Sequence, residues 1–137
     1  MIKFINREFD LKLVNKRDIF ICAFGYEKRS LTIYYKMVEV LSPDHILVFV
    51  FDDYKNYNYI SSEIDKVVDK SEIETKLVKY DSEIMIYNSI ATFIRLKIQE
   101  NQEMNVHIDY SSMPRRWYYK LPIQLRNMVG GINSIYF

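Results

Sequence analysis

The sequence predicts one α/β domain of three layers, in which a mainly parallel sheet of five strands lies between helices. The chain has 137 residues, which is the size of one domain. Short apolar runs alternate with longer segments whose apolar residues recur every three or four positions. Strands and helices that alternate in this way form right-handed crossovers, which give a parallel sheet covered by helices on both faces.

Five segments have the composition of strands. They are residues 19–24, 45–51, 74–80, 104–109 and 132–137. The first two are continuous apolar runs with β-branched and aromatic side chains, which is typical of strands buried on both faces. Because the fifth segment reaches residue 137, we expect the chain to end on its last strand. Residues 2–14 fit either an additional edge strand or an arm, because their periodicity does not decide.

Four further segments have the spacing of amphipathic helices. The first three are residues 31–41, 60–68 and 86–98. The fourth is expected to begin near Pro114, because proline is favoured at the first helical position, and Ser112 or Met113 would then be its cap. Pro122 lies inside this segment and lacks a backbone N–H, so we expect a kink or a restart there.

The composition limits the class of protein and its compartment. The longest apolar runs are far shorter than the roughly 20 residues that cross a bilayer, which argues against a membrane partner. The start of the chain lacks the apolar core of a secretory signal. The one cysteine, Cys22, cannot form an internal disulfide and is expected to be a small buried hydrophobe. These features favour a reducing, cytoplasmic location.

Charge is unevenly distributed, although the formal net charge is only +1. Residues 110–137 carry no acidic side chain, and their basic residues are Arg115, Arg116, Lys120 and Arg126. A net charge near zero argues against a protein that coats DNA regardless of sequence, because such binding needs a strong overall basic field. The basic C-terminal quarter favours a small anionic ligand or a local nucleic-acid contact. The simplest alternative is a solvated helix face.

Alternating strands and helices indicate a Rossmann-like or flavodoxin-like fold. In such sheets, ligands bind beyond the carboxyl ends of the strands, where the strand order reverses. With the Rossmann-like order 3-2-1-4-5, this crevice lies between the loops after the first and fourth strands. With the flavodoxin-like order 2-1-3-4-5, the loop after the first strand faces the third strand instead. The first order predicts a site formed by residues 24–30 and 109–116.

The loop after the first strand has features of an anion site. Gly25 lets a ligand approach the backbone where a Cβ would obstruct it, and the following helix presents free N–H groups. The other ligand contacts expected here are Tyr26, Arg29 and Ser30. The simpler interpretation is an ordinary strand-to-helix turn, in which Glu27 is an acid that favours the helix dipole.

The loop after the fourth strand carries the more specific signal. Asp109 ends a buried strand, and Ser111 and Ser112 offer hydroxyl and backbone donors beside it. Arg115 and Arg116 fall in the first helical turn, where positive charge is unfavourable to the dipole unless an anion lies in front. In the simpler interpretation, Ser112 caps the helix, Asp109 accepts backbone hydrogen bonds, and Arg115 pairs with Asp109.

Acidic residues also end the second strand. Asp52 is expected to accept hydrogen bonds from ribose hydroxyls, as acids at this position do in dinucleotide folds. Magnesium held by the acids at these strand ends is a weaker alternative. His45 and His107 have no partners at the spacing of zinc ligands. The sequence therefore assigns no metal, and it leaves the cofactor open.

At these two loops the chain resembles the Rossmann-like sensor and effector modules of prokaryotic defence systems, of which the CARF type is the nearest. The resemblance rests on residues 24–30 and 109–115. It implies a module of antiviral defence that senses a cyclic oligonucleotide with these loops and commonly forms dimers. The chain departs from the usual Gly/Thr-rich turn after the fourth strand, because Ser111, Ser112, Met113 and Pro114 precede Arg115.

Three functions are compatible with these residues. The first is a sensor module that binds a nucleotide or another phosphate-bearing ligand without consuming it. The second is a nucleotide-processing hydrolase that cleaves an N-glycosidic bond, with Glu27 or Asp109 stabilising the oxocarbenium-like charge or activating water. The third is an interaction subunit that docks a protein partner, a second copy or nucleic acid through its open last strand and basic C-terminal quarter.

Overall fold

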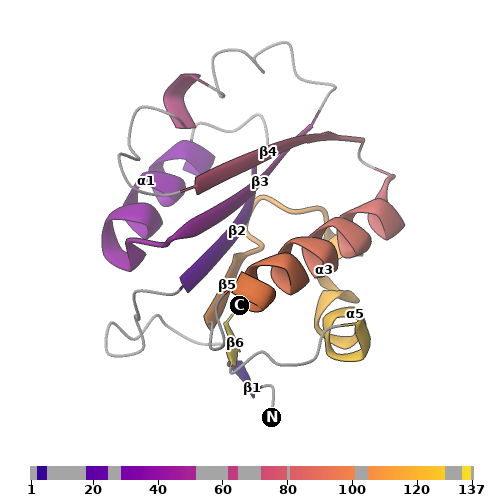
Figure 1. Cartoon of the computed structure of the whole chain (residues 1–137). Coiled ribbons are helices and arrows are strands. Elements are labelled where there is room, and N and C mark those ends of the chain that lie inside the picture. Colours follow the sequence, from indigo (N-terminus) through magenta and orange to yellow (C-terminus); the bar gives the residue numbers. More distant parts are fainter. Residues whose placement is uncertain are drawn as a thin grey trace.

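A computed structural model of the chain describes residues 3–5, 18–24, 29–51, 62–64, 72–79, 81–100, 105–128 and 134–136 (Figure 1). The strands are β1 (Lys3–Ile5), β2 (Asp18–Phe24), β3 (His45–Phe51), β4 (Glu72–Val78), β5 (Asn105–Asp109) and β6 (Ser134–Tyr136). The helices are α1 (Arg29–Leu41), α3 (Glu83–Glu100), α4 (Arg115–Tyr118) and α5 (Leu121–Met128), and residues 62–64 are also helical.

The strands form one parallel sheet in the order β1-β6-β5-β2-β3-β4. The predicted α/β class with a parallel sheet is therefore confirmed. The expected count of five strands is not, because β1 pairs with β6 and makes six. A strand of three residues is too short to show a period in the sequence. β6 consequently lies inside the sheet, and the two edges are β1 and β4.

The third predicted strand is shifted by two residues, and the second predicted helix is described only in part. The third strand was expected at residues 74–80, but β4 begins at Glu72, which lies opposite His45 of β3. Of the helix expected at 60–68, the structure describes only residues 62–64, and the rest lies outside the described residues. These residues pack near α1, because the Tyr35 hydroxyl donates a hydrogen bond to Glu63 Oε2 over 2.9 Å.

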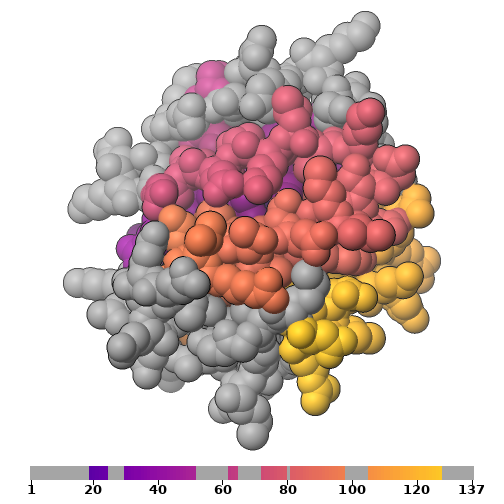
Figure 2. Space-filling model, turned by 45° about the vertical axis from the view of Figure 1, so that its right-hand side comes forward, coloured from indigo at the N-terminus to yellow at the C-terminus, as the bar shows by residue number. Residues whose placement is uncertain are grey.

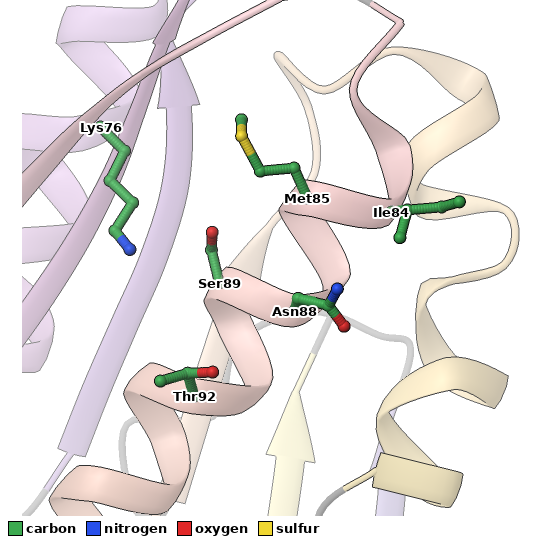
Figure 3. Close-up of a pocket in the computed structure, with 6 residues that line it drawn as sticks. All are labelled: Lys76, Ile84, Met85, Asn88, Ser89 and Thr92. Atoms are coloured by element: carbon green, nitrogen blue, oxygen red, sulfur yellow. The ribbon is translucent and has the colours of Figure 1, made fainter.

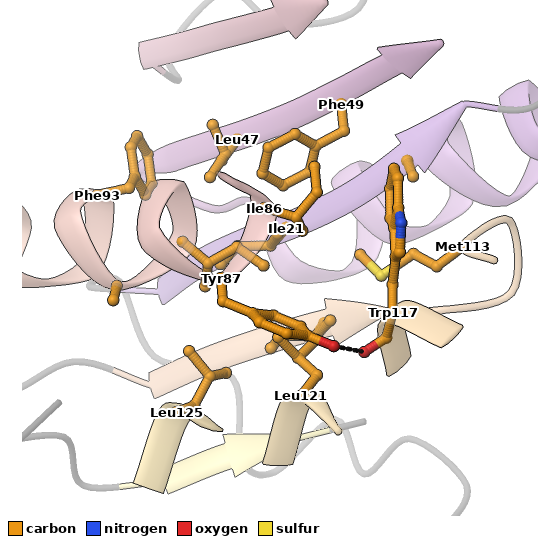
Figure 4. Packing of buried hydrophobic residues seen from close by; sticks show 14 of the residues in the cluster. Ile21, Leu47, Phe49, Ile86, Tyr87, Phe93, Met113, Trp117, Leu121 and Leu125 are labelled. Carbon is orange, nitrogen blue, oxygen red and sulfur yellow. Dashed lines mark hydrogen bonds between the residues drawn. The ribbon is translucent and has the colours of Figure 1, made fainter. Parts of the chain in front are cut away.

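Two apolar cores lie on opposite faces of the sheet. On one face, Tyr34, Val38 and Leu41 of α1 pack against alternate residues of β2 and β3. On the other face, α3, α4 and α5 pack against the intervening residues of the same strands (Figure 4). Every residue of β3 is buried, as expected for a strand covered on both faces. Each large apolar side chain buried here contributes about 1.5–3 kcal/mol, which is why helices cover both faces.

Trp117 packs α4 against the end of β3. Its side chain is fully buried and stacks on Phe51, with ring centroids 5.0 Å apart and planes at 27°. Phe49 packs against it edge to face at 6.4 Å. The Tyr87 hydroxyl of α3 donates to the carbonyl oxygen of Trp117 over 3.1 Å, the bond drawn in Figure 4. α4 is therefore held both by the sheet and by α3.

The fourth predicted helix is divided into α4 and α5. Residues 119 and 120 form a turn, and α5 starts at Leu121, so the restart expected at Pro122 is confirmed. Pro114 is not the first helical residue. It is the N-cap of α4, with an extended backbone (φ −56°, ψ 142°) and no side-chain hydrogen bond to the helix. The helix therefore begins near Pro114, as predicted, but with the proline at the cap and not at the first helical position.

Figure 2 shows the face that carries α3, with β4 on one side of the helix and α4 and α5 on the other. Several large apolar side chains are exposed on the molecule: Leu77, Ile84, Met85, Leu96, Tyr119 and Ile123. None of the described helices combines the length and the hydropathy that a membrane span requires.

Candidate functional site

The carboxyl ends of β2 and β5 lie side by side in the sheet. The five strands after β1 follow the first of the two orders considered from the sequence, so β2 and β5 are neighbours. Cys22 of β2 lies opposite Asp109 of β5 in the register. α1 then packs on one face of the sheet and α4 on the other. The sheet reverses its strand order between β2 and β5, which is where open α/β sheets bind their ligands.

A hydrogen bond joins the first turn of α1 to the loop after β5. The Oγ atoms of Ser30 and Ser112 are 2.8 Å apart, although 82 positions separate the residues in the chain, and either hydroxyl can donate. Ser30, in the first turn of α1, is only 5% exposed, and Ser112 is half-buried. The expectation that Ser112 or Met113 caps the next helix is wrong, because Pro114 occupies the cap position. The Ser112 hydroxyl binds the Ser30 hydroxyl of α1 instead.

Asp109 is oriented by the turn that follows it. Its Oδ1 atom accepts a hydrogen bond from the backbone N–H of Ser111 over 2.9 Å. The N–H of Met113 donates to the carbonyl oxygen of Tyr110, also over 2.9 Å, and closes the turn. This is the local role that the simpler interpretation of Asp109 predicted, and it fixes the carboxylate at the end of β5.

Cys22 is buried beside Asp109, and its thiol is unreactive. Burial raises the pKa of its thiol well above the ordinary value, and the negative charge of Asp109 raises it further. A thiol with a raised pKa stays protonated at neutral pH and is a poor nucleophile. The expectation that Cys22 is a small buried hydrophobe is confirmed.

The two arginines after the loop have different surroundings. The Nε of Arg116 pairs with the Glu83 carboxylate of α3, and the Arg116 carbonyl oxygen accepts from the Tyr87 hydroxyl over 3.2 Å. Arg115 is exposed, and no described carboxylate pairs with it. The ion pair between Arg115 and Asp109, which the simpler interpretation included, is therefore not formed. Both arginines are exposed, but Arg116 is held by Glu83, whereas Arg115 has no partner among the described carboxylates.

The N-terminus of α1 is the helix end that favours an anion at this site. α1 has 13 residues and no acidic residue in its first turn, so no charge within the helix offsets the positive end of its dipole. α4, by contrast, has only four residues, and few peptide dipoles align in it. The sequence-based expectation of a second anion-binding helix end at α4 is therefore not met.

Several predicted site residues lie outside the described part of the chain. They are Gly25, Tyr26, Glu27 and Asp52, and the side chain of Arg29 belongs with them. In the described part, no three His, Cys, Asp or Glu side chains group closely enough to hold a metal ion. Sequence analysis missed the roles of Glu83 and Tyr87, which secure α4. Their spacing of four positions on one helix was the available signal, because it puts both on the same face.

A shallow groove of about 410 Å³ lies elsewhere, between β4 and α3. Figure 3 shows Met85, Ser89 and Thr92 on the side of α3 that is turned toward Lys76 of β4, whereas Ile84 points away. None of the predicted ligand-binding residues lines this groove. It belongs to the edge of the sheet and not to the crevice between β2 and β5.

No protein family, curated protein or solved structure matches this chain.

Proposed function

We propose that the chain binds a nucleotide or another phosphate-bearing ligand in a Rossmann-like crevice between the loops after β2 and β5. The hydrogen bond between Ser30 and Ser112 carries this proposal. It brings the positive end of α1 against the loop that holds Asp109, so that donors from two distant segments converge on one place.

Each described residue of the crevice has a role that its chemistry supports. The hydroxyls of Ser30 and Ser112 donate to phosphate oxygens once they exchange their mutual hydrogen bond for the ligand. The guanidinium of Arg115 binds the phosphate in a bidentate way, because its planar fork matches two oxygens. Asp109 accepts a hydrogen bond from a sugar hydroxyl through the oxygen that Ser111 does not occupy.

The described groups favour binding over catalysis. Cys22 is protonated and buried, and Asp109 is already engaged by a backbone N–H, so neither is an activated nucleophile. We therefore propose that the ligand is retained unchanged. The resemblance to CARF modules extends this proposal to a sensor role. The hydrolase alternative uses Glu27 or Asp109, and of these Glu27 lies outside the described residues.

The experiment is a mass-spectrometric assay of the purified chain with NAD, nucleoside mono- and triphosphates, and cyclic oligonucleotides. We expect one ligand to be retained without a product. Titration calorimetry with that ligand then compares Arg115→Ala with Arg126→Ala. Arg126 is the matched control, because it is also an exposed arginine but lies on α5. Loss of a charge-assisted contact predicts about tenfold to a hundredfold weaker binding for Arg115→Ala and no change for Arg126→Ala.

The possible outcomes separate the hypotheses. A new product ion would replace the sensor proposal with the hydrolase, and attention would move to Glu27 and Asp109. Failure of every compound to bind, or unchanged affinity in Arg115→Ala, would contradict the proposal.

A further inference from the structure

β4 is an edge strand with an open side. It pairs with β3 along its whole length, and no described strand pairs with its other side (Figure 1). The Leu77 side chain is 49% exposed, and the side chains of Glu74 and Lys76 are 48% and 35% exposed. An open strand edge carries a row of backbone donors and acceptors that can pair with another strand.

The side chains of β4 form a pattern that is complementary to itself. Glu74 and Lys76 lie on the face of α3, because Lys76 lines the groove beside that helix and Val78, two residues on, belongs to its core. Ile73 and Leu77 lie on the opposite face, where Ile73 packs against the core of α1. Thr75 stands at the centre, with a charge of opposite sign on either side of it and an apolar residue beyond each.

This pattern matches an antiparallel pairing of two β4 strands about Thr75. In that register, Glu74 lies opposite Lys76 of the second copy, and the reciprocal pair forms as well. On the other face, Leu77 lies opposite Ile73 of the second copy. Side chains directly opposite in an antiparallel pair interact most strongly, and opposite charges or two apolar groups there are favourable.

Neighbouring registers are less favourable. A dyad perpendicular to the sheet keeps each face on its own side, so the register can shift only in steps of two residues. One step places Glu74 opposite Glu74 and Ile73 opposite Thr75, and its Lys76–Glu72 pairs use a carboxylate that Lys97 and His45 already occupy. A step the other way places Lys76 opposite Lys76 and Glu74 opposite the apolar Val78. Charge pairing and apolar pairing together therefore favour the register centred on Thr75.

We infer that β4 is a homodimer interface, in which two copies join their sheets through antiparallel pairing of β4 centred on Thr75. The strand is short, and such an edge buries less surface than a standard stable interface. The dimer is therefore weak and depends on concentration. This inference is independent of the proposed ligand. The sequence suggests the last strand as the open edge, but β1 pairs with β6 and covers it, so the interface is assigned to β4 instead.

The test is sedimentation velocity over a range of concentrations, with charge-swap variants. We expect the wild-type chain to dimerise reversibly. Lys76→Glu and Glu74→Lys each place two like-charged pairs across the dyad, and each variant alone should be monomeric at concentrations where the wild type is dimeric. An equimolar mixture of the two should form a heterodimer, because every cross-strand pair is then of opposite sign. The double variant Glu74→Lys with Lys76→Glu should dimerise again.

Controls separate this interface from general effects of charge. Glu39→Lys reverses an exposed charge on α1 and should leave the dimer unchanged. Circular dichroism and thermal unfolding of each variant exclude loss of the fold. A wild-type chain that stays monomeric at all concentrations would overturn the inference. So would a dimer that resists both single variants, or single variants whose mixture and double variant stay monomeric.

Discussion

Ser30 and Ser112 share a hydrogen bond of 2.8 Å between their hydroxyl oxygens, across 82 positions of the chain. The bond spans the place where the strand order reverses, and it connects the first turn of α1 to the loop after β5. Because Ser30 is almost completely buried, its hydroxyl has little access to water. The pair therefore couples the first turn of α1 to the loop after β5 even before a ligand binds.

The coupling predicts a non-additive double-mutant cycle. Ser112→Ala leaves the buried Ser30 hydroxyl without this partner, and we expect the free energy of unfolding to fall by about 1–3 kcal/mol. Ser30→Ala should cost less, because half-buried Ser112 is more accessible to water. The double variant should be more stable than the sum of the single changes predicts. Urea unfolding of the four proteins measures this. Strictly additive values would mean that the two hydroxyls do not interact.

The sequence predicts only in part that the first turn of α1 meets the loop after β5. The continuous apolar runs of β2 and β3 require helices on both faces, and from that requirement a parallel sheet follows. Local rules do not reveal the partner of Ser112, because the same residue also fits a helix cap and only the fold decides between the two. The short strand β1 carries no period at all, so its pairing with β6 emerges only in three dimensions.

The two adjacent arginines also differ in a way that only the fold decides. Arg115 and Arg116 are equivalent in the sequence, and both are basic residues in a first helical turn. Their roles separate because α3 passes beside α4 and places Glu83 next to Arg116. Which arginine pairs with an acid depends on how two helices pack, and neither helix carries that information by itself.

Tyr87 predicts a specific loss of stability. Its hydroxyl donates to the carbonyl oxygens of Arg116 and Trp117, and burial together with the nearby Glu83 carboxylate raises its pKa, although Arg116 opposes this. Tyr87→Phe keeps the ring and removes both bonds, so the free energy of unfolding should fall by about 1 kcal/mol. Tyr119→Phe is the matched control, because Tyr119 is 75% exposed. Thermal unfolding compares them, and equal midpoints would contradict the role assigned to Tyr87.

Cys22 offers a chemical measure of how the site opens. It is the only cysteine, it is buried, and its raised pKa keeps it as a thiol. Reaction with a disulfide reagent at neutral pH should be slower than in the denatured chain by more than about a thousandfold, since it requires opening of a stable fold. Absorbance of the released thiolate follows the rate. Fast labelling of the native chain would show that the strand ends of β2 and β5 separate readily.

At the opposite end of the sheet, Glu72 predicts a dependence of stability on pH. Its Oε2 atom accepts hydrogen bonds from Lys97 over 3.0 Å and from His45 over 3.1 Å. The hydrogen bond and charge of Lys97, followed by those of His45, lower the pKa of Glu72 despite some desolvation. The Lys97 side chain is buried and its ammonium lies 5.6 Å from the ring of Phe93, so the acid holds a cation against the core.

A carboxyl group with a lowered pKa in the folded state stabilises the fold above its unfolded pKa, and this contribution is lost as pH falls through the folded pKa. Glu72→Gln should therefore lower the free energy of unfolding at pH 7, by up to about 1 kcal/mol because Glu72 itself is largely exposed. The difference from wild type should shrink below about pH 4, where the unfolded carboxyl is protonated. Glu39→Gln, on the exposed side of α1, should show neither effect. Urea unfolding at several pH values measures both variants. A difference of the same size at pH 3 and pH 7 would mean that packing, and not the charge of Glu72, holds Lys97 in place.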